Sequence, residues 1–193
     1  MKFILDSNGK KVLRRLLLVI LIFIPITCRT YSIVNNYLYD DIWKLSAIDV
    51  ESTVYNAVPA QCNNNFGYTA NMFYLDLYDV ESHKIIAMER TFMKELGLNY
   101  GDVVKIEGVG KYDGIYQIQD TMNKRFAGQH KIDILVDDSV KVGKWNNVKL
   151  YILKNKNLTK SFISTFKPEI SKQENKKQMQ RKRKEWKKMA KNN

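Results

Sequence analysis

Between residues 50 and 153, short apolar runs alternate with clusters of Gly, Asn and Asp. Six runs are rich in β-branched and aromatic residues, and they cover residues 50–58, 84–88, 102–106, 114–118, 131–136 and 148–153. Short strands bounded by turn residues at this spacing predict a mainly β domain, a small barrel or sandwich. One further run, residues 90–96, is stopped by Gly97 and predicts a single short helix with Phe92, Met93 and Leu96 on one face.

The N-terminal 30 residues have a different pattern. Four basic residues, Lys10, Lys11, Arg14 and Arg15, precede an apolar run over residues 16–28. A basic segment followed by an apolar run of this length is typical of a secretory signal or a membrane anchor. We therefore expect export across the cytoplasmic membrane to a periplasmic or membrane-anchored place in the cell envelope. Cleavage, lipidation at Cys28 and retention all stay open, and residues 31–49 are expected to form a linker or short helix.

The C-terminal residues 154–193 form a basic tail. They contain fourteen Lys and Arg against three acidic residues, a net charge of +11. Such a segment has too little apolar surface to fold alone, so we expect a charged helix or a disordered tail. It is either a solvated tail that aids solubility or a segment attracted to an anionic membrane or wall polymer.

The net charge of +12 does not indicate a nucleic-acid-binding core. Residues 40–153 carry twelve Lys and Arg against sixteen acidic residues, so the predicted barrel is mildly acidic at −4. A duplex-binding domain needs basic residues on its folded surface. We therefore expect no nucleic-acid partner. The two cysteines, Cys28 and Cys62, suggest neither a disulfide framework nor a metal site.

Carboxylates are the candidate chemical groups. The chain has no metal-binding, phosphate-binding or dinucleotide motif, so no cofactor or metal is expected. Three acids lie inside or directly after a predicted strand: Glu89, Asp120 and Asp133. Asp133, among Ile132, Ile134 and Leu135, has a raised pKa if its strand is half buried, which suits a general acid. The alternative is that strand alternation turns Asp133 to solvent while the two isoleucines pack inward.

At these residues the chain resembles a known family. The segments Ala87-Met88-Glu89-Arg90, GDVVKIEG at residues 101–108, Asp120-Thr121, Ile132-Asp133 and VKLYIL at residues 148–153 follow one another in the order of the 3D domain, named for three aspartates. Thr69-Ala70 matches the domain's upstream Thr-Ala motif. That domain is a six-stranded double-psi β-barrel found in membrane-bound lytic transglycosylase A and related to rare lipoprotein A. The resemblance covers about residues 50–153, so it implies this fold for the whole predicted barrel.

The resemblance implies cleavage of peptidoglycan glycan strands without water, by closure of a 1,6-anhydro ring. It places Asp133 at the acid/base position, Asp120 beside it and Glu89 in a supporting role. Thr69, Tyr68 and Lys124 are the expected substrate-binding residues, through a hydrogen bond, sugar stacking and the loop after Asp120 respectively. A monomer is expected.

Three departures from the family pattern bear on activity. Glu89 replaces the usual Asp, and Asn71 stands where Ser is common. Asp120 and Asp133 are thirteen positions apart instead of eleven, and residues 122–125 replace a Gly-Gly pair. Loss of these glycines changes the loop that approaches a ligand. A non-catalytic peptidoglycan-binding or envelope scaffold barrel is therefore the alternative to an enzyme.

Overall fold

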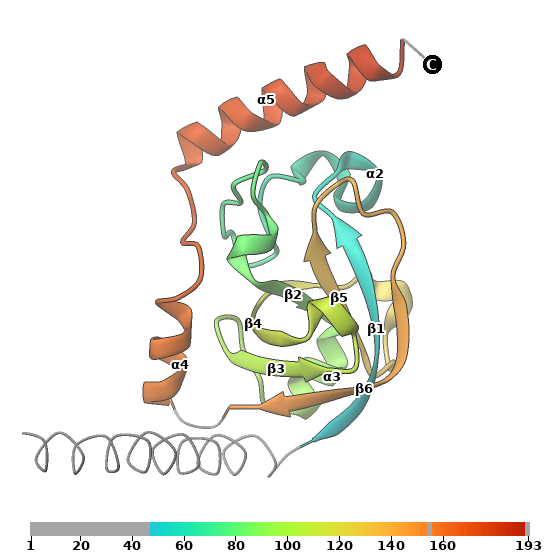
Figure 1. Cartoon of the computed structure of the whole chain (residues 1–193), viewed down its shortest axis with the longest axis vertical. Helices are drawn as coiled ribbons and strands as arrows, with labels where there is room; N and C mark the ends of the chain where they lie inside the picture. Colours follow the sequence, from blue (N-terminus) through green and yellow to red (C-terminus); the bar gives the residue numbers. More distant parts are fainter. Residues whose placement is uncertain (1–46, 154–155, 192–193) are drawn as a thin grey trace, which may run out of the picture. The chain divides into compact units, whose positions relative to one another are not determined.

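The computed structural model of the 193-residue chain describes residues 47–153 and 156–191 (Figure 1). The predicted signal or anchor segment and nearly all of the predicted linker lie outside the described residues. Among the helices that are described, none has the length and apolar character needed to cross a membrane.

Six strands close into a barrel in the order β1-β5-β2-β4-β3-β6. Their bounds are Ile48–Asn56 (β1), Ile85–Met88 (β2), Val103–Glu107 (β3), Gly114–Thr121 (β4), Lys131–Val136 (β5) and Lys144–Ile152 (β6). Each overlaps one predicted strand, so the prediction of a small six-stranded barrel is confirmed. β6 begins four residues before its predicted start, because Lys144 and Trp145 pair with β1 across a bulge.

The barrel is mixed, and its pairing pattern has an internal symmetry. β1 pairs with β5, and β2 with β4, in parallel; the other four pairs are antiparallel. Exchanging β1 with β4, β2 with β5 and β3 with β6 leaves every pair unchanged. The barrel therefore consists of two interlocked three-strand halves, and β2 and β5, one from each half, pair with each other.

The core divides into two clusters because β5 is covered on both faces. Ile132, Ile134 and Val136 point into the barrel and belong to the larger cluster. Leu135 points outward into a second cluster with Phe66, which the loop after β1 contributes. The alternation predicted for this strand is therefore present, but its outward face is covered by protein instead of water.

Short helices connect the strands. Two are α-helical, α2 (Pro59–Cys62) and α3 (Arg90–Glu95). The barrel region also contains four single 3₁₀ turns: Asn63–Asn65, Glu81–His83, Gly110–Tyr112 and Lys124–Phe126. α3 begins where predicted because Glu89 caps it, its carboxylate accepting from the N–H groups of Thr91 and Phe92. It ends at Glu95, and Gly97 follows its C-cap Leu96 with a φ of +66° that is strained for other residues.

The described part of the basic C-terminal segment contains two helices. α4 spans Lys156–Ile163 and α5 spans Lys172–Met189. Ser171 caps α5 by accepting from the N–H of Glu174. One face of α5 is docked on the loops beside the barrel: Asn175 and Gln178 are buried, and Met179 and Trp186 pack against the second core cluster. Of the two forms expected for the tail, the helix is therefore the one found over these residues.

Candidate active site

The strand register places two of the candidate carboxylates in one row on the outer face of the barrel. Thr53 pairs with Asp133, Asp133 with Ala87, and Ala87 with Asp120, so four neighbouring strands contribute one residue each. Neighbouring strands lie about 4.8 Å apart, so roughly 10 Å separates the backbones at the two aspartates. The small side chain of Ala87 stands between them.

This row forms the floor of a polar groove with a volume of about 870 Å³. One wall is the loop after α2, which contributes Tyr68, Thr69 and Ala70. The other is the turn after β4, where Lys124 and Arg125 lie. Tyr68, Thr69 and Lys124, the predicted substrate-binding residues, therefore all line the same groove as Asp120 and Asp133.

Asp133 carries an unsatisfied buried oxygen at this floor. Its Oδ1 is shielded from solvent and has no hydrogen-bond partner. Burial raises the pKa of Asp133 from 3.8 to about 6. The charges of Lys131 and Arg125 oppose that rise, while the negative charges of Asp120 and Glu51 add to it. A carboxyl group in this state can hold a proton up to near-neutral pH, as a general acid must.

Asp120 is held by three donors. Its Oδ1 accepts from the backbone N–H groups of Ala70 (2.9 Å) and Thr121 (2.8 Å), and its Oδ2 accepts from the Tyr55 hydroxyl at 3.0 Å. Burial raises the pKa of Asp120 above its usual value, although these donors and the charge of Arg90 favour the ionised form. Asp120 is thus held in a fixed orientation in the same groove as Asp133.

Glu89, the third candidate, does not line the groove. Its carboxylate accepts from the N–H groups of Thr91 at 2.9 Å and Phe92 at 2.8 Å, at the start of α3. Burial by itself would raise its pKa, but the backbone N–H groups of Thr91, Phe92 and Gly128 outweigh it and lower the pKa. Arg90, the first residue of the helix that Glu89 caps, does line the groove.

The predicted binding residues differ in how they are held. Thr69 is buried, and its Oγ1 accepts from the N–H of Phe73 at 3.3 Å within its own loop. Tyr68 packs its ring against Tyr74, with the ring centroids 5.8 Å apart. Lys124 is exposed at the rim of the groove. A ligand in the groove therefore meets one exposed cation and one aromatic ring on opposite walls.

Three further groups of the groove act on the two aspartates. Tyr55 and the backbone N–H of Ala70 both bind Asp120, and Arg125 lies near enough to Asp133 to affect its pKa. The Thr69-Ala70 motif indicated that this loop belongs to the site. It did not indicate the hydrogen bond from Ala70 to Asp120, because that bond uses the backbone N–H of Ala70 and not a side chain. Cys62 also lines the groove, and burial raises the pKa of its thiol to about 12, so it stays protonated.

Metal ligands do not gather in the described part of the chain: no group of three or more His, Cys, Asp or Glu residues there could hold an ion.

Comparisons with known proteins give one structural match. No family model matches the chain, and no curated protein matches it. The crystal structure of the computationally designed protein msDPBB_sym2 matches with 16% sequence identity and a TM-score of 0.32, over 56% of this chain and 99% of the designed one. A match at this level identifies neither a family nor a function.

Proposed function

We propose that the protein is a lytic transglycosylase-like enzyme that cleaves peptidoglycan glycan strands, with Asp133 as general acid and base. The observation that carries the proposal is the buried, unpartnered Oδ1 of Asp133 at the floor of an open groove, on a carboxyl group whose pKa is about 6. The resemblance to the 3D domain and its double-psi β-barrel supplies the substrate class. The pairing of two interlocked three-strand halves is compatible with that fold.

The proposed reaction needs only one proton-transferring group. Protonated Asp133 gives its proton to the glycosidic oxygen as the bond from C1 of N-acetylmuramic acid to that oxygen breaks. The resulting carboxylate then takes the proton of the muramyl 6-hydroxyl, and O6 bonds to C1 to close the 1,6-anhydro ring. Asp133 ends protonated again, and no water is consumed.

Asp120 has an electrostatic role in this scheme. Its three donors keep it in place, and its negative charge favours the proton on Asp133 and the positive charge that develops at C1. Tyr68, Thr69 and Lys124 are proposed to bind the sugar from the two walls. Glu89 supports the site indirectly, by capping the helix that begins with Arg90.

The decisive experiment compares Asp133→Asn with the wild type on purified glycan strands. Loss of a general acid/base is expected to reduce formation of 1,6-anhydro products about 100-fold or more. Asp49→Asn, an exposed surface change, is the matched control and should leave the rate unchanged. Equal product from Asp133→Asn would remove Asp133 from its role. Binding of the wild type to insoluble peptidoglycan with no soluble product would favour the non-catalytic barrel.

Export of the protein rests on the N-terminal segment and is proposed on that basis alone. Labelling with a membrane-impermeant reagent in intact cells should reach Lys124 at the groove rim if the barrel is outside the cytoplasmic membrane. Labelling only after the cells are broken would contradict export.

The outward face of α5 is proposed to bind an anionic membrane or wall polymer. Because the docked face uses Asn175, Gln178 and Trp186, the opposite face presents exposed basic side chains: Lys172, Lys176, Lys177, Arg181, Lys184, Lys187 and Lys188. Changing four of these to Gln should abolish binding to anionic vesicles or to a wall polymer at low salt, since each contributes about 1 kcal/mol near a charged surface. Binding that persists to both would overturn the proposal. Deleting α5 is a poor test, because deletion also uncovers Phe66.

A further inference from the structure

The docked face of α5 contacts the same loop that forms one wall of the groove. Asn175 is 2% exposed, and its Nδ2 donates to two backbone carbonyls, Gly67 O at 2.5 Å and Leu75 O at 2.8 Å. Leu75 N also donates to Gly67 O, so these two residues close the base of the loop between them. One side chain of α5 therefore holds both ends of the loop.

Further contacts hold the chain on either side of this loop. Gln178 Oε1 accepts from the N–H of Leu77 at 2.8 Å. Arg183 donates to the carbonyl of Asn64 at 2.9 Å, and the ring of Trp186 lies 5.1 Å from that of Phe66. The residues before and after the loop are thus fixed by three successive turns of one helix.

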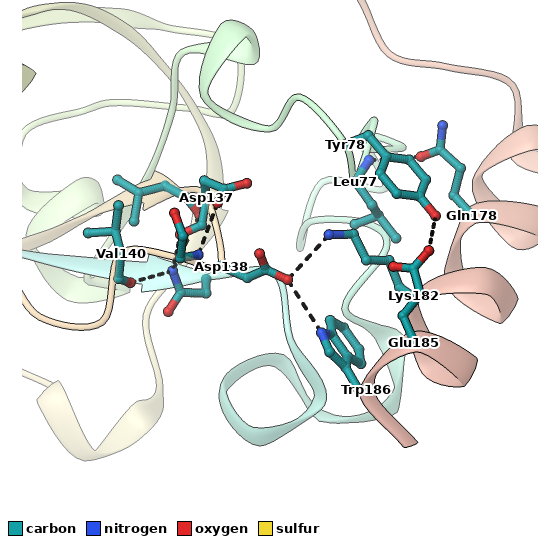
Figure 2. A network of polar contacts seen from close by, with 12 residues as sticks. Leu77, Tyr78, Asp137, Asp138, Val140, Gln178, Lys182, Glu185 and Trp186 are labelled. Carbon is teal, nitrogen blue, oxygen red and sulfur yellow. Dashed lines mark hydrogen bonds and ion pairs between the residues drawn. The ribbon is translucent and has the colours of Figure 1, made fainter. Parts of the chain in front are cut away.

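A second anchor keeps α5 in place from the other side. Figure 2 shows Lys182 and Trp186 both directed at the carboxylate of Asp138, in the turn after β5, and Tyr78 directed at Glu185. Lys182 Nζ and Trp186 Nε1 each lie 3.3 Å from Asp138 Oδ2. The helix therefore bridges the groove loop and the turn that follows the strand of Asp133.

The tip of the loop reaches the site. Ala70 N donates to Asp120 Oδ1 at 2.9 Å, and Asn71 binds Gln119 through both its backbone N–H and its side chain. The loop thus has its base on α5 and its tip on β4. The Ala70 N–H joins this wall to Asp120.

From these contacts we infer that α5 is a clamp: it holds the loop of residues 67–75 as a rigid groove wall and thereby positions the Ala70 N–H on Asp120. Asn175 is then a positioning residue, acting on the site through the loop. The functional part of this inference rests on the proposed enzyme activity, whereas the mechanical part does not.

The test replaces the donor without changing the shape of the side chain. In Asn175→Asp, a carboxylate faces two buried carbonyls and can no longer donate to them. Hydrogen exchange at the Ala70 amide is expected to accelerate roughly tenfold or more, since a buried acceptor pair has lost its donor. Gln180→Glu adds the same charge on the exposed face of the same helix and should leave Ala70 unchanged. Exchange at Ala70 within twofold of the wild type in Asn175→Asp would overturn the clamp.

Two milder variants keep the test decisive if Asn175→Asp does not fold. Gly67→Ala acts from the loop side, because its Cβ would lie 2.5 Å from Met179 Sδ and 2.6 Å from Asn175 Oδ1. Arg183→Gln removes the contact with Asn64 O. Both are expected to accelerate exchange at Ala70 severalfold while Ile86 and Ile134 inside the barrel stay protected, and no change at Ala70 in either would also overturn the clamp.

A titration separates positioning from mere stabilisation. Detaching Ala70 N–H removes a donor from the ionised form, so the pKa of Asp120 should rise in Asn175→Asp when followed by carboxyl NMR. The other groups that face Asp120 are Tyr55 on β1, Cys62 on α2, Arg90 on α3 and Asp133 on β5, and all are unchanged by the substitution. An unchanged titration would overturn the positioning role. If the wild type cleaves no glycan but exchange at the Ala70 amide accelerates in Asn175→Asp, the proposed function fails and the clamp stands. If the wild type cleaves glycan but exchange at Ala70 is unchanged in Asn175→Asp, the clamp fails and the proposed function stands.

Discussion

Glu89 and Asp133 lie on neighbouring segments, directly after β2 and on β5, but their pKa values move in opposite directions. The backbone N–H of Glu89 donates to the carbonyl of Lys131, only two residues before Asp133. Glu89 is 3% exposed, yet its pKa is lowered, while that of Asp133 is raised to about 6.

The difference lies in the donors that each carboxyl group meets. Glu89 caps α3 and receives N–H groups that favour its ionised form. Asp133 lies mid-strand, where the backbone donors are used in the β-ladder, and its Oδ1 receives none. In this barrel the supply of donors, more than burial, decides whether the pKa of an acid is lowered or raised.

The largest change in stability is expected from Glu89→Ala. Removing the cap leaves two N–H groups without their acceptor, so the free energy of unfolding at pH 7 should fall by roughly 3 kcal/mol. Because the pKa of Glu89 is lowered in the folded state, its contribution is present above the usual Glu value of 4.5 and is lost as the pH falls through the folded pKa. Urea unfolding at several pH values measures both the loss of unfolding free energy and its dependence on pH. Glu95→Ala, exposed on the same helix, should change stability by less than about 0.5 kcal/mol; an equal loss in the two variants would contradict the capping role.

Asp133→Asn is expected to have the opposite effect on stability. Native Asp133 keeps its proton up to about pH 6, while the unfolded side chain ionises near 3.8, so the native state binds more protons between these values. The wild type therefore loses stability as the pH rises through that window. Removing the acid should stabilise the protein by about 2 kcal/mol at pH 8 and by roughly a quarter of that at pH 4. Thermal unfolding across this range measures the difference, and a variant that is less stable than the wild type at pH 8 would show that Asp133 has a favourable partner.

The smallest effect is expected at Tyr55. Tyr55→Phe removes one of the three donors to Asp120 and should raise the pKa of that carboxyl group further, with a loss of stability of about 1 kcal/mol. Carboxyl NMR measures the titration directly. Tyr68→Phe changes another tyrosine of the same groove and should leave Asp120 unaffected. A lowered pKa in Tyr55→Phe would mean that the hydroxyl does not stabilise the ionised form.

Local patterns predicted the elements well, and for clear reasons. The six strands are bounded by turn residues, and the Glu89 to Gly97 segment contains both a cap and a stop signal. Asp133 is the instructive case: alternation turns it outward, as the solvent-facing alternative held, but there it lines a groove and its Oδ1 is shielded from solvent. Residues 68–70 form one wall of that groove, and no local pattern relates them to residue 133.

The amphipathic character of α5 was equally hidden. Its docked face consists of Asn175, Gln178, Met179, Lys182 and Trp186, which are mostly polar residues. This face is held on the loops by hydrogen bonds to backbone groups and to the Asp138 carboxylate. Because these contacts are polar, apolar periodicity does not distinguish the segment from a solvated tail.

By itself, the sequence determined which segments extend, which coil, and which acids lie at strand positions, because turn residues, caps and side-chain branching act over a few residues. Only the tertiary structure decided that Asp120 and Asp133 share a groove, that Glu89 serves a helix, and that a basic segment holds the groove wall. These outcomes depend on strand order, on register and on which buried donor reaches which acceptor, and such contacts join parts of the chain that local propensities do not relate.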